Sequence, residues 1–264
     1  MAREVSSITR VGTSEPFELQ VSRGQVAYHN TQFKFGFNPD VDDSLETVWS
    51  QGGLYSYISA ATVLKVSSSN TNDTSAGTGA RTVTLSGLDG NYDEITETVT
   101  LNGQTAVNTT NSFLRIYRMI VQTAGSGGQN AGVIYAGTGT VTSGVPANVY
   151  GAIAIGDNQT LMALWTVPRG YTAYLFQNHT TVATEQNNKF ATITLVARPS
   201  GGVFAIKDKF VTDLGENIQD YSYPLKFEEK TDIEVRCIGS SAGANIAVSS
   251  GLDFIYIQNR PYPE

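Results

Sequence analysis

The sequence LMALWTVPRGYTAYL, at residues 161–175, contains two short apolar runs that flank the turn sequence VPRG at residues 167–170. Proline restricts φ to the value that the second position of a type I turn requires, and glycine is common where such a turn closes. The stretch therefore predicts a strand, a tight turn and a second strand. Similar short apolar runs, separated by turn residues, follow one another along the rest of the chain, and no segment has a convincing helical pattern.

The composition also favours an all-β protein. Of the 264 residues 16% are charged, while Ser, Thr, Asn and Gly are abundant, which is typical of strands with one solvated face and many turns. The net charge is -7 and lysine and arginine form no cluster, which argues against binding to nucleic acid. The first residues, MAREVSS, lack the apolar region of a signal peptide, and no apolar run is long enough to cross a bilayer. We therefore expect a protein that is made in a cytoplasm and matures without membrane export.

Three segments are predicted from the distribution of apolar runs. Residues 1–40 are predicted to be an extended N-terminal arm, and residues 41–145 a first sandwich-like unit that ends in a Gly-rich crossing at 125–144. Residues 146–264 contain eight or nine short runs with the spacing of an antiparallel β-sandwich. Jelly-roll connectivity is the leading prediction for this second unit, although spacing does not determine connectivity and cannot separate one continuous fold from two sandwiches.

The arm contains the first candidate interface residues. Phe33, Phe35 and Phe37 alternate with more polar residues, and two isolated strands cannot bury three phenylalanines. We expect them to pack on the following unit or on a neighbouring subunit. Three tyrosines lie beside prolines in segments that cannot be central strands, and these are also candidate interface residues: Tyr221, Tyr223 and Tyr262.

Two local pairings are predicted within the first unit. The Asn102-Gly103 pair is the strongest hairpin signal in the chain, because both residues tolerate the positive φ of a type I′ turn. Glu97 and Arg118 each interrupt the apolar face of a predicted strand. If the two strands pair, these side chains could form a partly buried ion pair.

A search for catalytic and metal-binding patterns gives only weak matches. The sequence GSSAG at 239–243 fits the nucleophile-elbow pattern, but the residues after it predict a strand where the elbow requires a helix. His179 is interpreted as a surface-loop residue and His29 as an interface or surface residue. Asp40, Asp42, Asp43 and the loop NTND at 70–73 contain oxygen ligands that suit calcium, but they lack the spacing of a calcium loop, so solvated turns are favoured. We expect no catalytic residue, cofactor or metal.

Cys237 is the only cysteine in the chain, so no internal disulfide can form. It follows Ile233 and Val235 in an alternating segment and is predicted to share their face. A small buried core side chain is the favoured interpretation.

Three segments together resemble a known family: LETVWSQGGLYSY at 45–57, the strand-rich run 80–121, and WTVPRGY at 165–171. They look like a family of virion structural proteins of marine and freshwater tailed phages, including cyanophages. The resemblance covers most of the chain after the arm, and its motifs are structural. It implies a non-enzymatic component of an assembled particle, present in many copies and located in the virion.

The role within the particle is left open between two hypotheses. A head decoration or cement protein is the first, because a sandwich with an arm suits docking on a capsid lattice. The major capsid protein is excluded, since its fold in tailed phages needs a long helix that this chain lacks. The alternative is a tail component, as adaptor, fibre or receptor-binding protein, that recognises a host-surface glycan. Either role implies other virion proteins as partners and a homo-oligomer, with a trimer favoured. Exposed aromatic side chains beside the arm would favour assembly, whereas aromatic side chains on distant loop tips would favour recognition.

Overall fold

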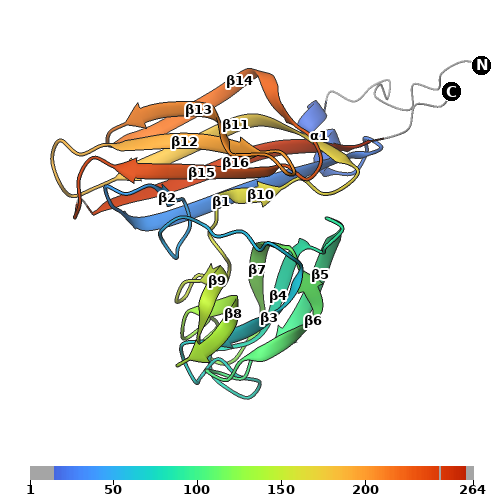
Figure 1. The fold of residues 1–264 in the computed structure, drawn as a ribbon, viewed down its shortest axis with the longest axis vertical. Coiled ribbons are helices and arrows are strands. Elements are labelled where there is room, and N and C mark those ends of the chain that lie inside the picture. Colours follow the sequence, from blue (N-terminus) through green and yellow to red (C-terminus); the bar gives the residue numbers. More distant parts are fainter. Residues whose placement is uncertain (1–14, 244, 260–264) are drawn as a thin grey trace, which may run out of the picture.

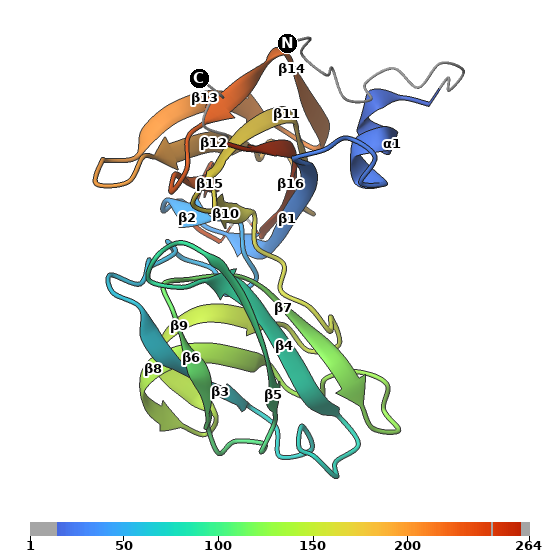
Figure 2. The same ribbon diagram turned by 90° about the vertical axis from the view of Figure 1, so that its right-hand side faces the viewer.

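The regular structure of the described residues consists almost entirely of antiparallel strands, as the sequence predicts. A computed structural model describes residues 15–243 and 245–259. Over these residues the chain forms sixteen strands and one short helix, α1 (Phe17–Ser22). The strands make two units that lie one above the other in Figures 1 and 2.

The larger unit is a two-layer sandwich made from both ends of the chain; we call it the sandwich. Its strands are β1 (His29–Val41), β2 (Glu46–Thr47), β10 (Leu164–Thr166), β11 (Tyr171–Ala183), β12 (Ala191–Arg198), β13 (Ala205–Thr212), β14 (Gly215–Phe227), β15 (Asp232–Gly239) and β16 (Ile246–Gln258). Sheet 1 has the order β1-β16-β11-β14, and sheet 2 has the order β10-β15-β12-β13 with β2 also paired to β15. The inner faces enclose one core, which includes Trp165, Leu195, Val235, Leu252 and Phe254.

The smaller unit is inserted between β2 and β10; we call it the insert. Its strands are β3 (Thr62–Ser68), β4 (Ala80–Leu88), β5 (Glu94–Thr100), β6 (Val107–Phe113), β7 (Arg115–Ala124), β8 (Ile134–Thr142) and β9 (Val145–Ile153). They form one sheet of order β6-β3-β8-β9 and one of order β5-β4-β7. The insert has its own apolar core, with Leu64, Leu85, Phe113, Ile116 and Met119 fully buried.

The chain leaves the sandwich for the insert, and returns from it, at one place beside β15. β2 pairs with β15 at Arg236 and Cys237, and β10 continues along the same strand from Glu234. Between them the Val48 N–H donates to the Val235 carbonyl at 2.9 Å, and the Ala163 N–H donates to the Val48 carbonyl at 2.9 Å. β2 and β10 therefore act as two pieces of one strand. The 114 residues between Val48 and Ala163 interrupt it, and the two ends of this segment lie side by side.

The expected boundaries of the arm and the two units differ from this arrangement. Residues 29–41 are not an arm but the strand β1, which pairs with β16 from His29 opposite Ile257 to Val41 opposite Ile246. The alternation at residues 17–21 belongs to α1, which begins after Pro16, a residue that suits a helix start. Residues 1–14 lie outside the described residues. The second unit does not begin at 146, because β9 belongs to the insert and the chain re-enters the sandwich at Ala163.

Three local predictions are also corrected by the pairing of the strands. Asn102 and Gly103 do not form a hairpin turn, since β5 pairs with β4 and β6 pairs with β3. The Gly-rich crossing contains the whole of β8. The Glu97–Arg118 ion pair does not form because β4 lies between β5 and β7: Glu97 instead accepts the Thr110 and Asn111 N–H groups.

The turn at residues 167–170 connects the two sheets of the sandwich. The Tyr171 N–H donates to the Pro168 carbonyl at 3.3 Å, and Gly170 has a φ of +79°, which favours glycine. The predicted strand, turn and strand are confirmed as β10, turn and β11, but Pro168 is the first residue of the turn and not the second, as the prediction of a type I turn requires. The two strands are not neighbours in one sheet, however, because β10 lies in sheet 2 and β11 in sheet 1.

Candidate functional site

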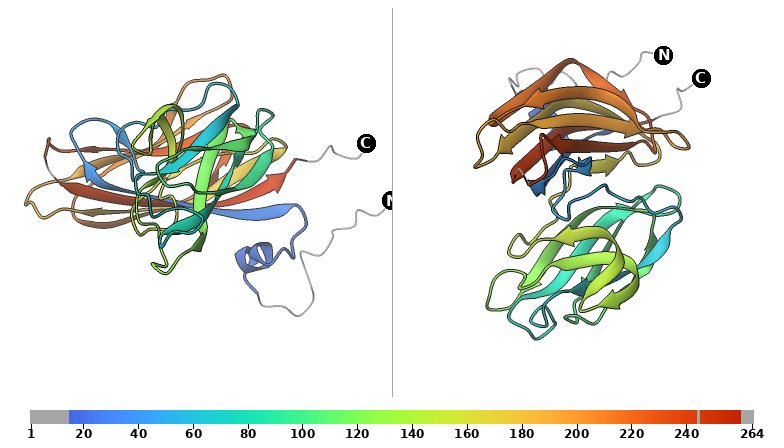
Figure 3. Two further views of the ribbon diagram at one scale, coloured as in Figure 1. Left: turned by 90° about the horizontal axis from the view of Figure 1, so that it is seen from below. Right: turned by 60° about the vertical axis from the view of Figure 1, so that its left-hand side comes forward.

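The outer face of sheet 1 brings the candidate phenylalanines together with a set of polar residues. The strand registers place these side chains in three rows, running from β1 through β16 and β11 to β14: Phe33, Asp253, Gln177 and Asp220; Phe35, Gly251, His179 and Ile218; and Phe37, Ser249, Thr181 and Glu216. Figure 3 shows this sandwich from two further sides. We call this surface the outer face of sheet 1.

One side of this face is aromatic. The rings of Phe33 and Phe35 stack with centroids 5.4 Å apart, and His179 stacks on Phe33 at 5.8 Å. A Cβ atom on Gly251 would lie 2.2 Å from the His179 ring, so glycine provides the space that the imidazole occupies. Arg118 reaches the same area from the insert, with its guanidinium 5.9 Å from the Phe35 ring centre and a hydrogen bond to the Phe33 carbonyl at 3.0 Å.

Hollows flank this aromatic group on both sides. A groove of about 400 Å³ lies next to α1 and is lined by Glu18, Phe33, Phe176 and Asp253, among others. Burial raises the pKa of Asp253 above that of an ordinary aspartate. A second hollow of about 290 Å³ is lined by Phe33, Phe35, Phe37 and Leu161 with other residues.

The opposite side of this face, along β14, is acidic and exposed. Glu216 and Asp220 are both exposed, and Ile218 between them is 51% exposed. The three rows contain three carboxylates and no lysine or arginine. This face could therefore contact another protein both through its aromatic side chains and through its carboxylates.

The remaining predicted interface residues have different positions. Four residues of β14, 221–224, bulge outward opposite Phe176, and Tyr223 in this bulge is 89% exposed. Tyr221 turns inward, and its hydroxyl donates to Asp208 Oδ2 at 2.9 Å. Burial and this carboxylate raise the pKa of Tyr221. Tyr262 lies outside the described residues.

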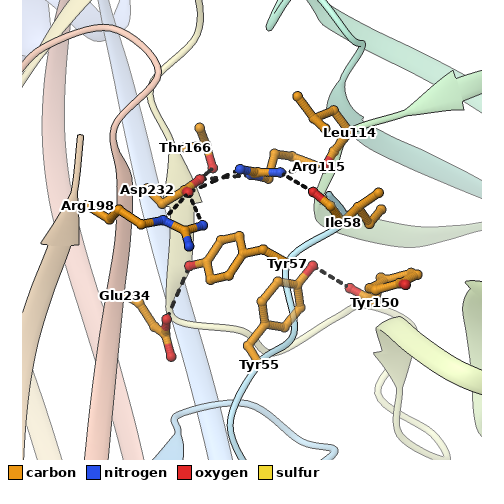
Figure 4. Close-up of polar contacts among 10 residues, drawn as sticks. All are labelled: Tyr55, Tyr57, Ile58, Leu114, Arg115, Tyr150, Thr166, Arg198, Asp232 and Glu234. Carbon is orange, nitrogen blue, oxygen red and sulfur yellow. Dashed lines mark hydrogen bonds and ion pairs between the residues drawn. The ribbon is translucent and has the colours of Figure 1, made fainter. Parts of the chain in front are cut away.

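A second polar site, missed by sequence reasoning, joins the insert to the sandwich; we call it the joint (Figure 4). Arg115, at the start of β7, donates from Nε to Asp232 Oδ1 at 2.8 Å and from Nη2 to Asp232 Oδ2 at 3.1 Å. Arg198 donates to the same carboxylate at 2.6 Å, and the Thr166 hydroxyl donates at 2.6 Å. Arg115 also donates to the carbonyl of Ile58 at 2.9 Å. One buried carboxylate thus bridges two arginines from different units.

Aromatic rings fill the rest of the joint. The Tyr57 ring lies 5.0 Å from the Arg115 guanidinium and 4.7 Å from that of Arg198, and its hydroxyl donates to Glu234 Oε2 at 3.2 Å. Burial raises the pKa of the Tyr57 hydroxyl, with Glu234 adding to the effect. The Tyr55 hydroxyl donates to the Tyr150 carbonyl of the insert at 3.0 Å. Because every charge has a partner, the joint suits a structural role that fixes the two units.

The structure also places the weak chemical motifs of the sequence. Residues 239–243 connect β15 to β16, and the next described element is a strand. Asp73 is fully buried and accepts the Ala80, Ala131 and Gly132 N–H groups, so the prediction of a solvated turn is wrong for this residue. No group of metal-ligating residues occurs in the described ranges.

The histidines and the cysteine are also placed by the structure. His179 is not in a surface loop but within β11, on the outer face of sheet 1. His29 is partly exposed at the start of β1, and its Nδ1 is 2.9 Å from the Ala27 carbonyl. Cys237 is fully buried in the sandwich core with Ile233 and Val235, as predicted, and burial raises its thiol pKa. None of the helices in residues 15–243 and 245–259 is long and apolar enough to cross a membrane.

Comparison with known proteins finds no family model and no curated protein that matches the chain. The resemblance to tailed-phage virion proteins therefore remains an expectation. Among solved structures, the chain is similar to a structure of the Gx strain of infectious bursal disease virus, with 12% identity and a TM-score of 0.27. It is also similar to the VP2 subviral particle of that virus, with 12% identity and a TM-score of 0.26. Both alignments cover 89% of this chain and 73% of the other, but TM-scores this low do not establish a common fold.

Proposed function

We propose that this protein is a non-enzymatic structural component of a virus particle, and specifically a head decoration or cement protein. In this proposal the sandwich makes the contacts with neighbouring particle subunits, and the insert projects from it. The resemblance seen in the sequence supports the virion role. The position of the exposed aromatic side chains is the observation that favours a role in subunit contacts over a role in glycan recognition.

Within the described residues, every exposed large aromatic side chain belongs to the sandwich or its helix: Phe17, Tyr28, Phe33, Phe190 and Tyr223. The loops at the far end of the insert, 69–79, 101–106, 125–133 and 143–144, contain no aromatic residue. Interfaces are enriched in aromatic residues, whereas such small polar loops provide no ring on which a ligand could stack. This distribution supports contacts between particle subunits through the sandwich.

The connectivity of the sandwich supports a further part of the proposal, that it is a jelly roll. Numbered along the chain with β2 and β10 as one strand, the sandwich has eight strands. Sheet 1 then has the order 1-8-3-6 and sheet 2 the order 2-7-4-5. Two interleaved Greek keys produce this pattern. The predicted second unit would then contribute most, but not all, of the jelly roll, since β1 and β2 come from residues before 48.

The location of the protein on purified particles tests the proposed role. Antibody-gold labelling spread over the head is the expected result for a decoration protein. Label confined to the tail would contradict it and support the alternative, a tail component that binds a host glycan. Particles without any label would contradict the virion role itself.

The phenylalanines provide a second test on the isolated protein. Replacing Phe33, Phe35 and Phe37 together with Ala should dissociate the oligomer, because these side chains lie on the outer face of sheet 1 and leave the core intact. The β-strand signal in circular dichroism should remain. An unchanged oligomer in sedimentation would argue against an assembly role for this face.

A further inference from the structure

The two outer faces of the sandwich differ in charge. The outer face of sheet 1 contains Asp253, Asp220 and Glu216 in its three rows, and Arg118 of the insert reaches it at the β1 edge, at Phe33 and Phe35. On the other side of the sandwich, β13 contains Lys207 and Lys209, both exposed. The only acidic residue of β13, Asp208, turns away and accepts the hydrogen bond of the Tyr221 hydroxyl.

The basic face is also apolar and uncovered. In sheet 2, Lys209 lies opposite Thr194 and Val211 lies opposite Thr192, whereas Phe210 packs on the core, so Lys209 and Val211 point outward. Val211 is 61% exposed and Ile206 is 60% exposed. The segment before β3 covers sheet 2 at β15 and β12, where Tyr57 contacts Glu234 and Arg198, and it reaches Phe204 just before β13, with ring centroids 5.6 Å apart. We call the exposed surface of β13 the β13 face.

Each face lacks within its own chain the partner that the other provides. No ion pair of Lys207, Lys209 or Glu216 exists within the described part of the chain. Exposed apolar side chains that gather next to such charges mark a contact surface. The two faces are complementary in charge and both are partly apolar. Ile218 and Phe33 lie beside carboxylates on one face, and Ile206 and Val211 lie beside lysines on the other.

We propose that the outer face of sheet 1 binds the β13 face of a second copy of this chain. The contact is heterologous, because the two surfaces are different, and each bound copy keeps one free surface of each kind. Such a contact closes into a ring when its rotation allows and otherwise extends into an open stack. Because the two surfaces lie on opposite sides of the sandwich, the contact favours an open stack over the trimer expected from the sequence. This inference deepens the proposed structural role and names the surfaces through which copies associate.

Edge-to-edge pairing of β14 is a poorer explanation of the same exposed residues. β14 is the edge strand of sheet 1, but Pro224 removes an N–H and residues 221–224 bulge away from the ladder. Proline and bulges are devices that prevent strand addition at an edge. Association through the faces makes no use of this blocked edge.

Charge reversal on the full-length protein tests the proposal by analytical ultracentrifugation. The variant Lys207→Glu/Lys209→Glu and the variant Glu216→Lys/Asp220→Lys should each weaken self-association by roughly a hundredfold, because like charges then face each other. The variant with all four changes should associate again, since attraction is restored with reversed signs. Higher salt should weaken the wild-type assembly, as screening reduces the attraction.

Two single-residue controls on the insert test whether a charge reversal of either sign outside the two faces has the same effect. Asp157→Lys and Lys65→Glu change exposed or partly exposed charges outside both faces and should leave the assembly unchanged. Circular dichroism of each variant checks that the strands remain. A wild-type protein that stays monomeric, or four changes that fail to restore association, would overturn the inference.

The outcome is distinguishable from failure of the proposed function. Gold label on particles together with a monomeric wild-type protein would retain the virion role and remove the inferred contact. Self-association in solution that responds to the charge reversals, without label on particles, would retain the contact and remove the virion role. A loss of association in the β14 variant alone, with no effect in the β13 variant, would indicate a symmetric contact and also overturn the proposal.

Discussion

Asp232 is the residue on which the joint between the two units depends. Its side chain is 4% exposed and accepts hydrogen bonds from Arg115 of the insert and Arg198 of the sandwich. A second ion pair, between Arg169 and Asp93, also joins the units, but these side chains are 52% and 42% exposed. Water screens the exposed pair and not the buried one, so the two differ strongly in their effect on stability.

Replacing Asp232 with Ala should therefore lower the free energy of unfolding by about 3–5 kcal/mol, because the buried Arg115 and the partly buried Arg198 lose their counter-charge. Replacing Asp93 with Ala should cost only about 0–1 kcal/mol, since that pair is solvated. Urea unfolding of both variants measures the difference. Equal effects would mean that the joint does not depend on its buried charges.

Lys34 presents the opposite case, a buried base whose charge is disfavoured. It is fully buried, its Nζ donates to the Tyr117 carbonyl, and burial together with the charge of Arg118 holds its pKa well below the ordinary lysine value. The unfolded chain then binds a proton that the folded chain releases. The free energy of unfolding contributed by this group therefore rises with pH between the lowered folded pKa and the ordinary value.

The substitution Lys34→Met should remove this pH dependence and raise the melting temperature at neutral pH, because methionine fills similar space without charge. Thermal unfolding at several pH values checks both statements. The advantage of the variant should shrink as the pH approaches the ordinary lysine pKa. An advantage that stays constant with pH would contradict the lowered pKa.

At the scale of elements, β1 packs closely against the strand that β2 and β10 form, at the place where the insert interrupts that strand. A Cβ atom on Gly36 would lie 2.2 Å from the Ala163 nitrogen and 2.2 Å from the Val48 oxygen, the two residues where the insert joins. Both are backbone atoms already joined by a hydrogen bond. They cannot move aside as a flexible side chain could.

The substitution Gly36→Ala should thus destabilise the protein by about 1–3 kcal/mol or more, the cost of forcing extra atoms into a packed site. Gly90→Ala serves as the control, because its new Cβ would contact only the Ala61 side chain at 3.3 Å. Differential scanning calorimetry compares the two. A Gly36→Ala protein as stable as the control would show that the chain at the junction can separate.

The elements show where sequence reasoning succeeded and where it could not. Alternation identified β15 and the buried side of Cys237, because burial within one strand follows a local period of two. Pairing is not local: no pattern around Phe35 indicates that its partner is Gly251 near the other end of the chain. The joint was missed for the same reason, although Arg115 and Asp232 are charged residues beside apolar runs. A charged residue beside an apolar run could have marked each side chain as buried, but the two lie 117 positions apart in the sequence, and nothing there gives a sign that they pair.

At the scale of the whole molecule, the insert behaves as a separable unit. It has its own core and is connected to the sandwich by two chain segments that pair where Trp49 bridges Met162. The sandwich core contains few residues from the insert. Each unit therefore has most of what it needs to fold.

We expect that a protein in which residues 50–161 are replaced by Asn-Gly will fold as the sandwich alone. A two-residue turn of this kind suits the connection of paired strands. The uncovered Asp232 would keep Arg198 as its partner. Two-dimensional NMR with dispersed amide signals and a cooperative thermal transition is the expected result, and a spectrum of an unfolded chain would contradict it.

The way the insert is attached has a practical consequence. Because the chain exits at Val48 and returns at Ala163 as hydrogen-bonded neighbours, the sandwich constrains only the spacing of those two ends. Any domain whose termini lie equally close could be grafted there, including an enzyme, an antibody fragment or an antigen. If the protein coats a particle, this single position would serve as a display scaffold, with foreign cargo presented in many copies at a uniform orientation.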